Sequence, residues 1–96
     1  MVTLTAIIRC NPGSEAHVRK ALLEVARYAA QDEPGTLGYF VAESSGGGTF
    51  VTYERYASQA AMDAHNEGEG AKRFFAATET HLASVEVVTG PELFPE

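Results

Sequence analysis

The sequence has little cysteine, few basic residues and no long apolar run, and each shortage excludes a class of protein. The single cysteine, Cys10, cannot form an intramolecular disulfide framework and fits a reducing compartment, so we expect a cytoplasmic location. Seven Lys and Arg residues against 13 Asp and Glu give a net charge of −6, which repels nucleic acids and anionic membrane surfaces. No stretch approaches the length of a membrane span, and no signal peptide is expected.

Motifs that hold phosphates, nucleotides or metals are also missing. The glycine run 46–48 lacks the Lys-Ser/Thr pair of a phosphate-binding loop, and no GxGxxG pattern follows a predicted strand. His65, Glu67 and Glu69 alternate in a glycine-broken segment rather than at the i, i+4 spacing of a helical metal site. We therefore expect neither a nucleotide cofactor nor a bound metal.

Hydrophobic periodicity predicts four strands and two helices in a single domain, residues 1–96. Gly68 and Gly70 interrupt the second helix. The order is β-α-β-β-α-β, which predicts an α+β, ferredoxin-like fold with an antiparallel sheet. The predicted strands are Val2–Cys10, Thr36–Ser44, Thr49–Tyr56 and Val85–Thr89, and the predicted helical segments are Glu15–Asp32, a short segment capped by Ser58 that runs to about Asn66, and Ala71–His81.

One face of such a sheet is left without helices. Ile7, Val51 and Tyr53 make this second face partly apolar. The chain is small and has no disulfide, so association is a natural source of further buried area. These features predict a homodimer that forms face to face across the sheet.

Several short motifs, in order along almost the whole chain, resemble the antibiotic biosynthesis monooxygenase family. The resemblance implies a dimeric α/β barrel. It also implies a monooxygenase that oxidises a quinol or a polyphenolic or polyketide molecule with O₂ and without a cofactor. The motifs are Pro12-Gly13-Ser14-Glu15, Glu33-Pro34-Gly35 with Leu37-Gly38-Tyr39, Tyr53-Glu54-Arg55-Tyr56, Ala60-Ala61-Met62-Asp63-Ala64-His65, Phe74-Phe75 and His81-Leu82.

The family also contains haem-degrading enzymes, and the chain departs from their pattern. That branch is similar in fold but uses an Asn on the first strand, a Trp at the end of the third strand and a His ligand on the last helix. Here the first strand has no Asn, Tyr56 stands at the Trp position, and Ala77 or Thr78 falls near the ligand position. Haem is therefore not expected.

Three residues are the candidates for catalysis. Glu54 and Tyr56 are two apart on a strand and share a face, and His65 lies on the helix stripe that faces the sheet. A His oriented by a carboxylate is a suitable base near pH 7, and a deprotonated phenol can pass an electron to O₂. We assign His65 as base or substrate anchor, Glu54 as its orienting group, and Tyr56 as a contact to the substrate ring. The alternative is a structural Glu54–His65 hydrogen bond.

Aromatic residues provide candidate walls for a pocket that holds a flat ring. We assign Tyr39, Tyr53, Phe74, Phe75 and His81 to this pocket; the alternatives are core packing for the aromatic residues and helix capping for His81. Two other functions use the same fold: a non-enzymatic module that binds a small aromatic metabolite, and a structural dimer with a packed interior. A pocket large enough for a bicyclic ring would exclude the structural dimer.

Overall fold

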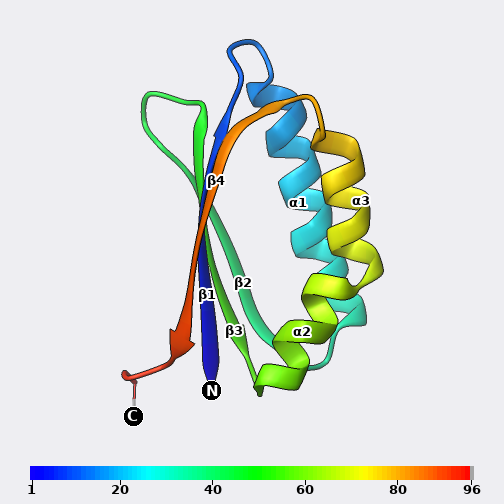
Figure 1. Cartoon of the computed structure of the whole chain (residues 1–96), viewed down its shortest axis with the longest axis vertical. Coiled ribbons are helices and arrows are strands. Elements are labelled where there is room, and N and C mark those ends of the chain that lie inside the picture. Colours follow the sequence, from blue (N-terminus) through cyan, green and yellow to red (C-terminus); the bar gives the residue numbers. More distant parts are fainter. Residues whose placement is uncertain (96) are drawn as a thin grey trace.

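The computed structural model describes residues 1–95 and has the predicted order of elements (Figure 1). The predicted α+β fold class is confirmed. The interrupted second helix is a pair of helices, α2 and α3. Glu96, the last residue of the predicted domain, lies outside the described residues. The elements are β1 (Val2–Cys10), α1 (Glu15–Asp32), β2 (Thr36–Glu43), β3 (Thr49–Tyr56), α2 (Gln59–Glu67), α3 (Glu69–Thr78) and β4 (Leu82–Pro91).

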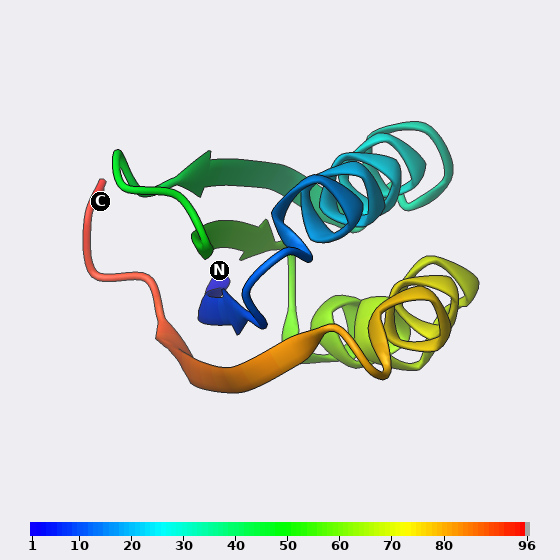
Figure 2. The same ribbon diagram turned by 90° about the horizontal axis from the view of Figure 1, so that it is seen from above.

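The four strands form one antiparallel sheet in the order β2-β3-β1-β4. All three helices lie on one face of it, and the other face carries no helix (Figure 2). Alternate residues of a strand point to opposite faces, so Leu4, Ala6 and Ile8 of β1 are buried under the helices. β2 and β4 are the edge strands, which places any group on β2 far across the sheet from one on β4.

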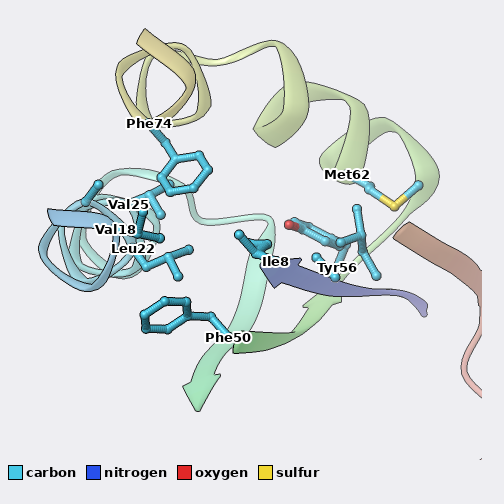
Figure 3. Packing of buried hydrophobic residues seen from close by; sticks show 11 residues of the cluster. Ile8, Val18, Leu22, Val25, Phe50, Tyr56, Met62 and Phe74 are labelled. Carbon is cyan, nitrogen blue, oxygen red and sulfur yellow. The ribbon is translucent and has the colours of Figure 1, made fainter. Parts of the chain in front are cut away.

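The core fills the space between the sheet and the helices (Figure 3). α1 contributes Val18, Leu22 and Val25, whose three- and four-residue spacing places them on one helix face. Phe50 and Tyr56 reach this core from β3, and both are buried. The helices are amphipathic, and none within residues 1–95 is long and apolar enough to cross a bilayer.

Two predicted boundaries differ from the structure. The last helix is predicted over Ala71–His81, whereas α3 begins at Glu69 and ends at Thr78, where the His81 amide bonds back to the Thr78 carbonyl. The last strand is predicted over Val85–Thr89, but β4 pairs with β1 along its whole length, Leu82–Pro91. Pro91 is tolerated because β4 is an edge strand, and an edge strand does not need every backbone N–H for pairing.

Candidate functional site

A cavity of about 90 Å³ lies between the sheet and the helices. Phe75, Val85 and Val87 line it and are exposed, so the cavity opens between α3 and β4. Its inner walls are mostly apolar. The polar residues that line it are Tyr39, Thr52, Glu54, His65 and Asn66.

Glu54 is a buried carboxylate on the cavity wall, with 3% of the residue exposed. The period-two geometry of β3 places Thr52, Glu54 and Tyr56 on the same face. The Thr52 hydroxyl donates to one carboxylate oxygen (2.6 Å) and the Tyr56 hydroxyl donates to the other. Burial, and then the bond to Glu54, raises the pKa of Tyr56. Both oxygens of Glu54 thus have a partner, which offsets the cost of burying the charge.

His65 lies on α2 between two carboxylates. Its Nδ1 is 2.5 Å from Glu33 Oε1, whereas its Nε2 is 3.7 Å from Glu54 Oε1, too long for a hydrogen bond. The orienting contact predicted for Glu54 therefore falls to Glu33. A carboxylate can only accept, so Nδ1 carries a proton in this contact, and in the neutral imidazole the lone pair is then on Nε2.

Glu33 belongs to the turn between α1 and β2, and the motif Glu33-Pro34-Gly35 by itself predicts no role for its carboxylate. The Thr36 hydroxyl donates to the same carboxylate oxygen at 2.9 Å, which fixes the side chain on a second side. A Cβ on Gly35 would lie 2.7 Å from the Cβ of Ala61, so the turn packs closely against α2. The sequence shows a glutamate beside Pro34-Gly35, but no local pattern pairs it with His65, which is 32 positions away along the chain.

Tyr39 lies on β2 opposite Glu54 in the strand register. Its ring centroid is 5.4 Å from that of His65, and that of Tyr56 is 5.5 Å from the same imidazole. Burial raises the pKa of Tyr39, and the negative charges of Glu54 and Glu33 raise it further. Its hydroxyl therefore stays protonated at neutral pH.

The structure separates the remaining candidates. Phe74 is buried and lines the cavity, while Phe75, 57% exposed, stands at its opening. Tyr53 does not reach the cavity, because it follows Thr52 and precedes Glu54 on β3 and so points to the opposite sheet face. There its hydroxyl donates to Glu92 at 3.1 Å.

His81 also lies away from the cavity. It directly precedes β4, where its ring stacks on that of His17 with centroids 4.0 Å apart. Its Nδ1 is 3.0 Å from Ser14 Oγ, at the beginning of α1. Ser14 is the N-cap residue of α1, but its side chain contacts His81 rather than a backbone N–H of the helix.

No cluster of three or more His, Cys, Asp or Glu suited to a metal ion occurs within residues 1–95. Cys10 is half-buried and packs against the core. Burial, and then the charge of Glu15, raises the pKa of the Cys10 thiol, which makes it a weak nucleophile. Three groups on the cavity wall can do acid–base chemistry: Tyr39, Glu54 and His65. Glu33 contacts His65 and Tyr56 contacts Glu54, but neither lines the cavity.

Comparison with known proteins places the chain in a family. The model of the antibiotic biosynthesis monooxygenase domain matches residues 1–77. The chain belongs to the antibiotic biosynthesis monooxygenase family. The match includes every residue proposed for the cavity's acid–base chemistry. No protein with a curated description matches the chain.

Solved structures share the fold of this family member over nearly its whole length. Rv0793 of Mycobacterium tuberculosis is 27% identical, with 96% of this chain and 94% of that chain covered and a TM-score of 0.87. PA3566 of Pseudomonas aeruginosa is 25% identical, with coverages of 96% and 93% and a TM-score of 0.87. A Nitrosomonas europaea protein, proposed to be an antibiotic biosynthesis monooxygenase, is 18% identical, with coverages of 98% and 100% and a TM-score of 0.90.

Proposed function

We propose that this protein is a cofactor-independent monooxygenase that oxidises a quinol or another phenolic ring with O₂. The observation that carries the proposal is the pair of contacts of the His65 imidazole. Its Nδ1 is 2.5 Å from Glu33 Oε1, a hydrogen bond, whereas its Nε2 is 3.7 Å from Glu54 Oε1, beyond hydrogen-bond distance. Membership of a monooxygenase family supports the same conclusion. The proposal includes a cytoplasmic location, which the single half-buried Cys10 supports.

The first step is a proton transfer from the substrate to His65. The phenol O–H bond breaks, Nε2 takes the proton, and the Glu33 carboxylate stabilises the resulting imidazolium through Nδ1. Glu54, 3.7 Å from Nε2, adds a second negative charge beside the cation. Both carboxylates therefore lie beside the imidazolium that the step creates.

The phenolate then supplies all the electrons that O₂ consumes. One oxygen atom forms a new bond to the ring and becomes a carbonyl of a quinone. The other leaves as water and takes up the proton held by His65 and one from the ring carbon. A phenol and O₂ thus give a quinone and water in balance, with no external reductant. His65 acts first as base and then as acid.

The size of the cavity limits what enters. A cavity of about 150 Å³ is known to hold benzene, and this one measures about 90 Å³. A bicyclic ring is too large for this cavity, because core side chains such as Leu22 and Phe74 line it closely. We propose that one hydroxylated ring edge enters the cavity and that the rest of the molecule emerges beside Phe75.

The face of the sheet without helices supports the second part of the proposal, a homodimer. Phe40 is 59% exposed and Val88 71% exposed on this face, and Val51 and Tyr53 lie between them. A second copy of the chain would cover these residues and replace the missing layer. Light scattering after size exclusion should give a dimer for the wild type. Val51→Glu should give a monomer, while Leu23→Glu on the exposed side of α1 should stay dimeric. A monomeric wild type at micromolar concentration would refute this part.

Oxygen consumption with a panel of monocyclic hydroquinones and phenols, without added cofactor, tests the enzymatic proposal. We expect uptake by the wild type and a loss of at least about 100-fold in His65→Ala. His17→Ala is the matched control, because His17 is exposed and lies outside the cavity. Binding without uptake would instead identify a module that holds small aromatic molecules. If the protein neither binds these compounds nor consumes oxygen with them, the structural dimer is the function that remains.

A further inference from the structure

The hydroxyl of Tyr39 is an unused hydrogen-bond donor at the cavity. Among residues 1–95, the hydroxyls of Thr52 and Tyr56 donate hydrogen bonds to Glu54, and the hydroxyl of Thr36 donates to Glu33. The Tyr39 hydroxyl makes no hydrogen bond within the same range, although Tyr39 lines the cavity and its ring lies beside His65. Within residues 1–95 Glu54 accepts from the hydroxyls of Thr52 and Tyr56 and not from that of Tyr39.

The Tyr39 hydroxyl remains accessible to solvent, because within residues 1–95 no buried side-chain nitrogen or oxygen lacks a hydrogen-bond partner. A ligand oxygen that enters the cavity can replace water as its acceptor. Because Tyr39 is protonated at neutral pH, it offers a donor rather than a negative charge. His65, whose ring centroid is 5.4 Å from that of Tyr39, offers Nε2 as the complementary acceptor when its imidazole is neutral. A hydroxyl group on a ligand can use both at once, since its oxygen accepts while its O–H donates.

The sheet order sets the direction in which such a ligand lies. Tyr39 is on the edge strand β2, and the exposed opening is formed in part by Val85 and Val87 of the opposite edge strand, β4. The Tyr39 hydroxyl therefore lies at the end of the cavity far from the apolar residues of its opening. A hydroxylated ring fits this polarity with its hydroxyl innermost.

We infer that Tyr39 donates a hydrogen bond to the same substrate oxygen whose proton His65 takes, and that the site thereby selects rings with a free hydroxyl. The chemical class of ligand is a hydroxyarene that enters hydroxyl first. The inference rests on the proposed function for the reaction that follows, but the binding preference does not require turnover.

Calorimetric titration with phenol and with toluene tests the preference, since the two differ chiefly in the hydroxyl. The wild type should bind phenol more tightly than toluene. In Tyr39→Phe the ratio of the two affinities should fall by roughly tenfold, and kcat/KM for a phenolic substrate by about 10- to 100-fold. Tyr28→Phe is the matched control, because it loses the same hydroxyl outside the cavity and should keep the wild-type ratio.

The outcomes separate the inference from the proposed function. An unchanged affinity ratio in a folded Tyr39→Phe variant, or equal binding of phenol and toluene by the wild type, would overturn the inference even if oxygen is consumed. A ratio that depends on Tyr39 without oxygen uptake would support the inference and overturn the oxygenase. Failure of the wild type to bind phenol would overturn both.

Discussion

Replacing Glu33 with Gln removes one charge beside His65 and nearly preserves the side-chain volume. The side chain of Glu33 is 14% exposed, and its Oε1 lies 2.5 Å from Nδ1 of His65. A hydrogen bond to a charged group contributes about 1.5–3 kcal/mol, and a neutral one about 0.5–1.5 kcal/mol. The amide oxygen can still accept from Nδ1, so we expect a loss of about 1 kcal/mol of folding free energy. In a domain of this size that lowers Tm by roughly 4–8 °C.

Thermal unfolding followed by circular dichroism measures this loss. Glu24→Gln is the matched control, because Glu24 is an exposed glutamate on α1, and its Tm should stay within about 2 °C of the wild type. Nitrogen chemical shifts of the His65 imidazole report separately on the proton at Nδ1. An unchanged Tm together with unchanged imidazole shifts in Glu33→Gln would refute the assignment of Glu33 as the group that orients His65.

Three other perturbations test the packing that supports the site. Leu22→Ala should lower the free energy of unfolding in urea by about 2–5 kcal/mol, since Leu22 is fully buried; a loss below about 1 kcal/mol would contradict this. Gly35→Ala should destabilise the fold by about 1–3 kcal/mol through its contact with Ala61, and Ala61→Gly in the same chain should restore part of the loss; no restoration would show another cause. Hydrogen bonds from Arg55 lower the pKa of Glu92 from 4.5, so its contribution to stability is present above about pH 4.5 and is lost as pH falls through the lowered value. The stability difference between wild type and Glu92→Gln should therefore shrink from pH 7 to pH 3, and a constant difference would contradict the assignment.

Local periodicity predicted one half of the site and misplaced part of the rest. Glu54 and Tyr56 were placed together because residues two apart on a strand must share a face. The same rule, applied to Tyr53, places that ring on the opposite face, where the structure has it. Chemical type alone had assigned Tyr53 to the pocket. His81 was assigned by its place on the predicted helix Ala71–His81, but α3 ends at Thr78, so His81 does not share the inward face of Phe74.

The sequence by itself determined the order of the elements, the faces of the strands and the helix stripe that carries His65, because these depend on backbone geometry over a few neighbouring residues. Only the tertiary structure decided which carboxylate holds His65. The close packing of Gly35 on Ala61 brings Glu33 to Nδ1 and leaves Glu54 with its two hydroxyl donors. The volume of the cavity was likewise decided by side chains from all four strands and all three helices, whose packing no local pattern contains.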